Sequence, residues 1–362
     1  MRNILKILDN NKVSQAKYLP ILGQILRTIG KNTVSIKMLE QELQKWSIEK
    51  KRTSKFYRNH NGILTHKAND KPTTAFKFYI DFLRELKLII KTNDFVRCSK
   101  YGFVFNALND ELYDNQDFPE FEKVFYLFYL FNNDADTLLL ILDYLTEYEK
   151  PVHQNIIAKN YKQLLKIRLE HKFLRTNNPE IRDKYLSLVK PKKESQTISK
   201  RIIPPRIEWL NDLGIIKETQ KDTYTLTNQG KYFFDTIPKQ DIKLNKLSEI
   251  NNKWVNNNFF KSISCLFKEK QPYKTNNIDI NILLGKYFRL SYKKLNTDSV
   301  ARISTLPVFI FVSIMLFVKH KLIINFSEME NKLLSGIIVD NKIFTLREAA
   351  RINESYILIN LK

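Results

Sequence analysis

The spacing of apolar and polar positions in residues 209–230 (WLNDLGIIKETQKDTYTLTNQG) predicts a helix followed by a β-hairpin. The first apolar residues of this stretch recur at helical spacing, and Gly214 provides the turn that ends the helix. Two extended segments then flank a polar tip, which is typical of two short antiparallel strands. We take this stretch to be the element around which the chain is organised.

A second stretch with the same pattern lies at residues 82–102 (FLRELKLIIKTNDFVRCSKYG). The shared apolar positions and the shared terminal glycine, which is one residue out of step, predict an internal repeat. A fainter third instance is predicted at residues 317–324, with residues 343–346 as its return strand. The matching residues of the first two stretches are Leu83 with Leu210, Leu86 with Leu213, Ile89 and Ile90 with Ile215 and Ile216, and Gly102 with Gly230.

Helical periodicity ahead of each hairpin supplies the rest of the repeat. We expect a mainly α fold with small β-hairpins, arranged as tandem winged helix-turn-helix units. The helices expected before the two hairpins cover residues 18–29, 35–46 and 73–88 in the first unit, and 136–148, 152–165 and a helix opened by Pro204-Pro205 in the second.

Acidic residues gather at 109–122 in a chain that is otherwise basic, and we place the first domain boundary there. The apolar run 121–131 is expected to be a helix at the junction. The expected domains are 1–115 and 116–240, both winged-helix, and 241–362, a helical domain or a third, degenerate winged helix.

The chain has 362 residues, 43% of them apolar, and a net charge of +22. A folded surface with this excess favours polyanionic partners, with nucleic acid first and an anionic membrane surface second. Two distant cysteines, Cys98 and Cys265, exclude a disulfide framework. The start of the chain lacks the apolar run of a signal peptide, and residues 306–318 are too short to span a bilayer. We therefore expect a cytoplasmic protein without a membrane partner.

One basic cluster precedes the expected third helix in each of the two units. Cations that neutralise phosphates supply sequence-independent DNA affinity. The N-terminal residues of that helix enter the major groove in helix-turn-helix proteins. The alternative for each cluster is a solvated loop of a lysine-rich protein. The residues expected to bind DNA are Lys50, Lys51, Arg52, Lys55, Arg58, Lys67, Thr73, Thr74 and Lys77, then Lys190, Lys192, Lys193, Lys200, Arg201 and Arg206.

Catalytic and metal-binding patterns are scarce, and we expect no catalytic residue, no metal and no cofactor. One segment, GIIVDNKIF at residues 336–344, places Asp340 two positions before Lys342. An acid and a lysine at this spacing on a strand occur in metal-dependent nucleases, where the acid holds a divalent ion. The alternative is a turn at Asp340 between two strands, and this is the structure we expect.

In the order of these parts, residues 1–237 resemble the DNA-recognition region of FokI-type type IIS restriction endonucleases. The resemblance lies in FLRELKLII, FVRCSKYG, FEKVFYLFYLF, LLLILDYL and WLNDLGII, followed by YTLTNQG. It implies consecutive winged-helix subdomains that recognise a DNA site. The C-terminal nuclease domain of that family is not evident beyond residue 237, so the resemblance implies a recognition subunit whose effector is another polypeptide.

We therefore expect a double-stranded DNA-binding protein that is not an enzyme. The expected setting is a bacterial restriction or anti-phage defence system, in which the protein acts with a nuclease or ATPase partner. A plasmid or phage replication initiator with tandem winged helices is the alternative from another class. A metal-dependent nuclease using Asp340 and Lys342, and a purely structural adaptor, are the remaining alternatives.

Overall fold

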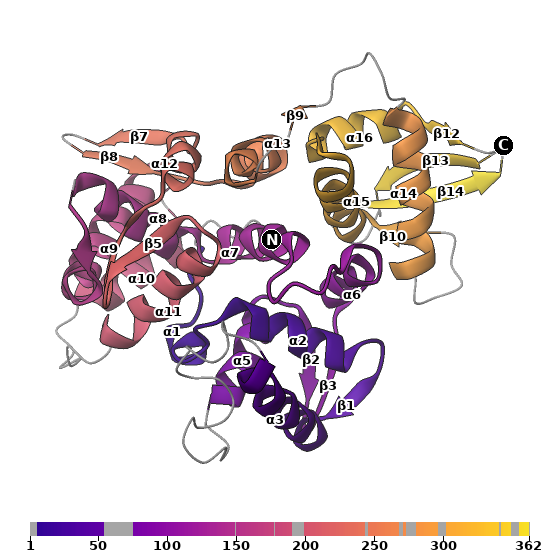
Figure 1. Cartoon of the computed structure of the whole chain (residues 1–362). Coiled ribbons are helices and arrows are strands. Elements are labelled where there is room, and N and C mark those ends of the chain that lie inside the picture. The colour runs from indigo at the N-terminus through magenta and orange to yellow at the C-terminus, as the bar shows by residue number, and fades with distance from the viewer. Residues whose placement is uncertain are drawn as a thin grey trace. The chain divides into compact units, whose positions relative to one another are not determined.

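The computed structural model describes residues 6–53, 75–148, 150–176, 178–189, 199–242, 245–267, 271–272, 280–295, 302–339, 342–348 and 355–361 (Figure 1). The described residues are mainly helical, with small antiparallel sheets, so the coarse prediction of the fold class is confirmed. Among them, no helix has both the length and the apolar character needed to cross a membrane.

The chain divides into two compact, discontinuous units. Unit 1 contains Met1–Leu22, Gln44–Leu86 and Tyr126–Val255, and unit 2 contains Gly23–Leu43, Lys87–Phe125 and Asn256–Lys362. These units cut across the three consecutive domains expected from the sequence, whose boundaries therefore stay predictions.

The first repeat follows the order helix, strand, helix, helix, hairpin, helix. Its three strands form one antiparallel sheet in the order β1-β3-β2. Its elements are α2 (Leu19–Ile29), β1 (Thr33–Ser35), α3 (Ile36–Thr53), α5 (Ala75–Glu85), β2 (Ile89–Thr92), β3 (Phe95–Cys98) and α6 (Lys100–Leu112). A short helix, α1 (Asn10–Val13), precedes it, and α7 (Glu120–Asn133) follows it.

The second repeat has the same order, with one helix added. Its sheet has the corresponding strand order, β4-β6-β5. Its elements are α8 (Ala135–Glu147), β4 (Val152–His153), α9 (Gln154–Thr176), α10 (Pro179–Val189), α11 (Ser199–Asp212), β5 (Ile216–Gln220), β6 (Thr223–Leu226) and α12 (Asn228–Asp235). Pro204 and Pro205, expected to open the third helix, lie inside α11, because that helix begins at Ser199.

In the first repeat, hydrogen bonds of one hydroxyl group connect the residue after the hairpin to a residue that follows the preceding helix. Ser99 caps α6: its Oγ accepts the Gly102 N–H at 3.2 Å and donates to the Lys87 carbonyl at 2.6 Å. Lys87, two residues after the end of α5, adopts the left-handed conformation, with φ 60°. The Ser99 N–H also donates to the Leu88 carbonyl at 2.9 Å.

The second repeat builds the same junction from Thr227. The Thr227 hydroxyl accepts the Gly230 N–H at 2.8 Å and donates to the Gly214 carbonyl at 2.8 Å. Gly214 is left-handed, with φ 73°, and the Thr227 N–H donates to the Ile215 carbonyl at 3.0 Å. Gly102 and Gly230 are thus equivalent third residues of helices, and the extra residue of the second hairpin lies at a register shift between Glu218 and Gln220.

A second anchor joins each hairpin tip to the start of a helix. The Ile36 N–H, at the start of α3, donates to the Asp94 carbonyl at 2.8 Å. The Gln154 N–H, at the start of α9, donates to the Asp222 carbonyl at 2.9 Å. These bonds satisfy backbone donors that a helix leaves free at its N-terminus.

The remaining elements follow the second repeat in chain order. They are β7 (Lys239–Ile242), β8 (Asn245–Ser248), α13 (Asn252–Ile263), the short η1 (Ser264–Leu266), β9 (Gln271–Pro272), α14 (Ile280–Leu295), β10 (Arg302–Ser304), α15 (Thr305–His320), β11 (Leu322–Ile323), α16 (Phe326–Leu334), β12 (Ile337–Val339), β13 (Lys342–Glu348) and β14 (Ser355–Leu361). In unit 2, α15 packs against α6 and α14, and the four-stranded sheet has the order β10-β14-β13-β12 (Figure 1).

The third hairpin differs from the expectation in its first half. Residues 343–346 lie in β13, a return strand as expected, but the strand before it is β12, which follows α16 and the left-handed Gly336. Residues 317–320 instead end α15, and β11 pairs in parallel with β9. The apolar run of α15 misled the prediction, because this helix is buried over nearly its whole length.

Substituting the two matched glycines tests the equivalence of the repeats. A Cβ on Gly102 would lie 2.2 Å from the Leu88 carbonyl oxygen, and one on Gly230 would lie 1.9 Å from that of Ile215. We expect Gly102→Ala and Gly230→Ala each to lower the free energy of unfolding, by about 1–3 kcal/mol. Urea denaturation followed by circular dichroism measures this loss.

Gly214→Asn is the matched control. A Cβ at this position has no neighbour within 4 Å, and asparagine tolerates the left-handed conformation. A loss for Gly214→Asn as large as that for Gly230→Ala would contradict the junction described above.

Candidate nucleic-acid interface

The structure describes the side chains of only four of the residues expected to bind DNA: Lys50, Lys77, Arg201 and Arg206. Lys51 and Arg52 lie in α3, and Lys200 lies in α11, but their side chains are not described. The following residues lie outside the described part of the chain: Lys55, Arg58, Lys67, Thr73, Thr74, Lys190, Lys192 and Lys193.

Lys77 and Arg201 each lie on a helix that precedes a hairpin, α5 for Lys77 and α11 for Arg201. Both side chains are exposed to solvent. Each of these two helices therefore presents at least one cation to solvent.

Arg206 does not face solvent, and the expectation that it contacts DNA is wrong. Its side chain is fully buried, and Nε donates to Asp134 Oδ2 at 2.6 Å while Nη2 donates to Oδ1 at 3.3 Å. Nη1 donates to the Ile202 carbonyl at 2.9 Å. All of these bonds are made inside the protein. A buried guanidinium must be paired with an acid, because its charge would otherwise be uncompensated.

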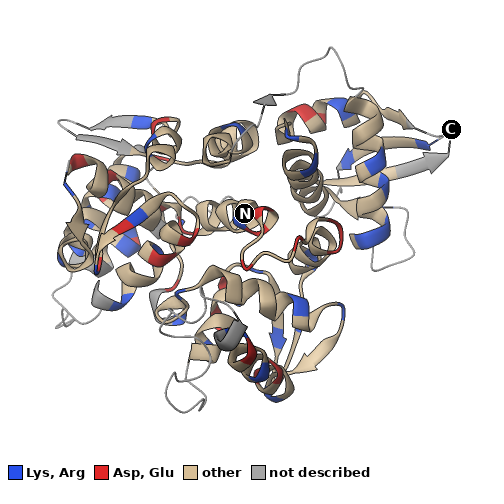
Figure 2. Cartoon of the chain, in the orientation of Figure 1, with Lys and Arg blue, Asp and Glu red and all other residues tan. Residues whose placement is uncertain are grey.

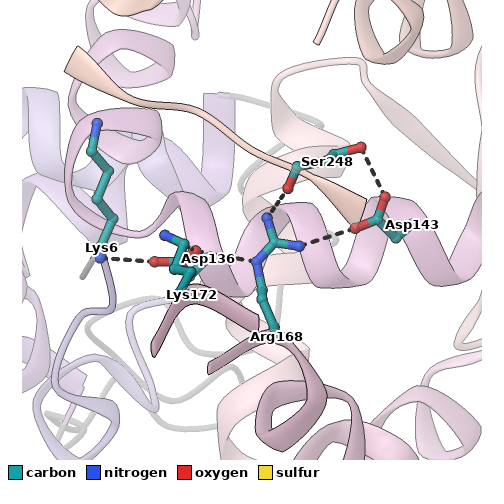
Figure 3. A network of polar contacts seen from close by, with 6 residues as sticks. All are labelled: Lys6, Asp136, Asp143, Arg168, Lys172 and Ser248. Atoms are coloured by element: carbon teal, nitrogen blue, oxygen red, sulfur yellow. Dashed lines mark hydrogen bonds and ion pairs between the residues drawn. The ribbon is translucent and has the colours of Figure 1, made fainter. Parts of the chain in front are cut away.

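The Arg206–Asp134 pair lies at the start of α8, and a larger buried cluster extends along that helix (Figure 3). Arg168 of α9 donates to Asp136 at 3.1 Å and to Asp143 at 3.1 Å, and it also bonds the Ser248 carbonyl. Lys172 lies 2.6 Å from Asp136. Burial raises the pKa of the Asp136 carboxyl, but Lys172 and Arg168 overcome this and hold it below its usual value.

Lys6 joins this cluster through its backbone. Its N–H donates to Asp136 Oδ2 at 2.9 Å, and its carbonyl accepts the Asp136 N–H at 3.0 Å. Figure 3 shows the Lys6 side chain extending away from that carboxylate. The amine is buried and finds no hydrogen-bond partner among the described residues. Burial lowers the pKa of the Lys6 amine to about 8, against the attraction of Asp136 and with a contribution from Lys172.

A cavity of about 200 Å³ lies in unit 2 between α2, α6 and α14. Arg27, Lys31 and Lys294 line it, together with Asn106 and Asp110. Two of these cations already have acidic partners: Arg27 pairs with Glu122, and Lys294 lies 2.9 Å from Asp110 and 3.4 Å from Glu111. Burial raises the pKa of the Glu122 carboxyl to about 7 despite Arg27.

The structure also reveals cations that the sequence reasoning missed. On the first hairpin, Arg97 is exposed and pairs across the sheet with Ile90 and Thr33. On α14, Lys286, Arg289 and Lys293 recur at spacings of three and four residues, and Figure 2 shows basic residues along this helix. That spacing places them on one helical face and was available in the sequence.

The described residues contain no group of three His, Cys, Asp or Glu side chains that could hold a metal ion. Asp340 lies outside the described part of the chain, whereas Lys342 begins β13 opposite Val339 of β12.

No family model matches this chain, and neither the curated proteins nor the solved structures contain a significant match.

Variants of two arginines of α11, one buried and one exposed, distinguish a structural role from a surface role. We expect Arg206→Met to lower the free energy of unfolding by about 3–5 kcal/mol, because it leaves the Asp134 carboxylate buried without its partner. Arg201→Met, at an exposed position of the same helix, should change it by no more than about 0.5 kcal/mol. Urea denaturation measures both. Equal stability of the two variants would show that the buried pair is absent in solution.

The buried amine of Lys6 predicts a pH-dependent effect. In the folded protein its pKa is lowered, so the folded state binds fewer protons than the unfolded state between about pH 8 and pH 10.5. The cost of burying the charge is thus full below pH 8 and disappears as the pH rises toward 10.5. Lys6→Met should stabilise the protein at pH 7, by on the order of a few kcal/mol at most.

The gain from Lys6→Met should shrink between pH 8 and 10.5 in thermal unfolding scans. Lys12→Met is the control from the same segment, since the Lys12 amine pairs with Glu85 at 2.8 Å and with Asp9 at 3.4 Å. Lys12→Met should not stabilise the protein, either at pH 7 or between pH 8 and 10.5. A gain for Lys6→Met that does not vary with pH would contradict the assignment of a buried, titrating amine.

Proposed function

We propose that this protein binds double-stranded DNA through two winged helix-turn-helix units, residues 19–98 and 135–226. The observation that carries the proposal is the repeated order of helices and strands, with equivalent sheets and equivalent anchors at Ser99 and Thr227. In this arrangement the helix before the hairpin is the recognition helix, and its N-terminal residues contact base edges in the major groove.

Charge supports duplex DNA as the partner. The chain carries a net charge of +22, and a cationic surface gains affinity for DNA by releasing the counterions condensed on its phosphates. The buried acids of α8 pair with buried cations, so these pairs leave the excess charge of the chain unchanged. Lys77 and Arg201 are exposed, and they lie on the two proposed recognition helices.

We further propose that the protein is the DNA-recognition component of a bacterial restriction or anti-phage defence system, acting in the cytoplasm with a nuclease or ATPase partner. The order of parts shared with FokI-type recognition regions supports this setting. A replication initiator would use the same architecture but would bind repeated sites side by side. A nuclease depends on Asp340, and no contact of a described residue favours it.

Salt dependence tests the proposed binding. We expect the affinity for a fluorescein-labelled 30-bp duplex of random sequence, measured by anisotropy, to fall at least about tenfold between 50 and 200 mM KCl. Lys77→Ala combined with Arg201→Ala should weaken binding and reduce the slope of log affinity against log salt by about 2, since each lost phosphate contact removes about one counterion.

The matched control removes two exposed lysines outside the proposed recognition helices, Lys231→Ala with Lys261→Ala. This variant has the same net charge as the test variant, and it should retain most of the affinity and the slope. An affinity that is indifferent to salt would refute DNA binding. Equal losses in the two double variants would refute the recognition-helix assignment alone.

A further inference from the structure

The two proposed recognition helices, α5 and α11, contact each other directly within unit 1. Phe82 of α5 stacks on Trp209 of α11, with ring centroids 4.4 Å apart and an angle of 16° between the ring planes. Both side chains are fully buried. Tilting either helix away from the other would expose two large aromatic faces to water, which the hydrophobic effect opposes.

The N-terminal segment of the chain bonds α11 at two points. Trp209 Nε1 donates to the Ala16 carbonyl at 2.6 Å. The N–H of Leu19, the first residue of α2, donates to Asp212 Oδ2 at 3.0 Å. Asp212 is the last residue of α11, so its carboxylate satisfies a donor that α2 leaves free at its N-terminus.

The same segment bonds α5. The Tyr18 N–H donates to Tyr79 Oη at 3.2 Å, and Lys12 Nζ donates to Glu85 Oε1 at 2.8 Å. Tyr18 and Leu19 are consecutive residues, yet one bonds α5 and the other α11. Because consecutive Cα atoms are held about 3.8 Å apart, these two bonds fix the separation of the helices at this point.

A further bond connects α11 to Asp134, the residue directly before α8. Arg206 pairs with Asp134, whose Oδ1 also accepts the Leu8 N–H at 2.9 Å. Residues 8–19 thus contact α5, α11 and the residue directly before α8, and every one of these contacts lies within unit 1. Separating α11 from α5 would therefore break several of these contacts.

We propose that α5 and α11, hereafter the helix pair, act as one rigid recognition element. The protein therefore binds a single continuous duplex site made of two sub-sites at a fixed spacing and a fixed helical phase. This inference rests on the proposed DNA-binding function. Two winged-helix units joined by a flexible linker would behave differently, because each could follow its own sub-site when the spacing changes.

Spacing variants of a selected site test the proposal on DNA. The probe is a pool of duplexes with a 30-bp randomised centre, selected with the full chain, and footprinting then defines the two sub-sites. Insertions of 5 and 10 bp are placed between them. The 5-bp insertion turns the sub-sites by about half a helical turn, whereas the 10-bp insertion restores the phase and changes only the distance.

A rigid helix pair predicts that both insertions weaken binding, by about 100-fold or more, because geometry forbids simultaneous contact. Recovery of affinity with 10 bp but not with 5 bp would overturn the inference and leave DNA binding intact, as would equal affinity for all three sites. Absence of any salt-sensitive binding would overturn both the inference and the proposed function.

A distance measurement tests the rigidity without requiring a known site. Nitroxide labels are attached to Lys77→Cys and Arg201→Cys in a Cys265→Ser background and measured by double electron–electron resonance. Cys98 can remain, because burial raises the pKa of its thiol to about 12 and keeps it unreactive. We expect one narrow distance distribution in the free protein. A broad distribution would overturn the proposal.

Trp209 variants show which contacts fix the helix pair. Trp209→Phe keeps an aromatic face for Phe82 but loses the N–H that bonds the Ala16 carbonyl, so the distribution should stay narrow. Trp209→Leu with Asp212→Ala removes the stacking and the bond to Leu19, and the distribution should broaden. The wild-type width in this second variant would show that these contacts do not fix the pair.

Discussion

The buried ion pair between Asp134 and Arg206 is the interaction on which the arrangement of unit 1 depends. Asp134 is the N-cap residue of α8, but its side chain makes no capping hydrogen bond; its carboxylate instead accepts bonds from Arg206 and from the Leu8 N–H. Removing two charges from water is expensive, and their attraction repays the cost only where every remaining donor is also satisfied. Here Arg206 bonds Ile202 as well. Such a pair adds little net stability, but it strongly disfavours any arrangement that separates its members.

The same reasoning applies to the neighbouring cluster and explains why α8 carries acids in a basic protein. Asp136 and Asp143 pair with Arg168 of α9, and Asp143 accepts the Ser248 hydroxyl at 2.8 Å. These contacts join α8 both to α9 and to β8. The carboxylates therefore select one register among helices whose apolar faces alone could pack in several ways. Lys6 is the exception, because its buried amine lacks such a partner among the described residues. Burying its charge therefore lowers the stability of the folded protein.

Much of the fold could be predicted from the sequence, because the signals were local. The spacing of Leu83 with Leu86 and of Leu210 with Leu213 located the helices before both hairpins, and the hairpins themselves are confirmed. The strands β1 and β4 were missed, because two or three residues are too few for alternation to be visible. Their partners, β3 and β6, are distant in the chain, so only the folded structure reveals the pairing.

The candidate site was predicted less well, and α11 shows why. Arg201 and Arg206 are five residues apart, so on a helix they point about 140° away from each other and cannot both face DNA. Trp209 and Leu210, three and four positions after Arg206, share its face of the helix, and they mark that face as the buried one. Helical spacing alone therefore selects Arg201 as the solvent-exposed residue of the two. The spacing does not reveal Asp134, whose place beside Arg206 comes from a contact 72 positions away in the chain.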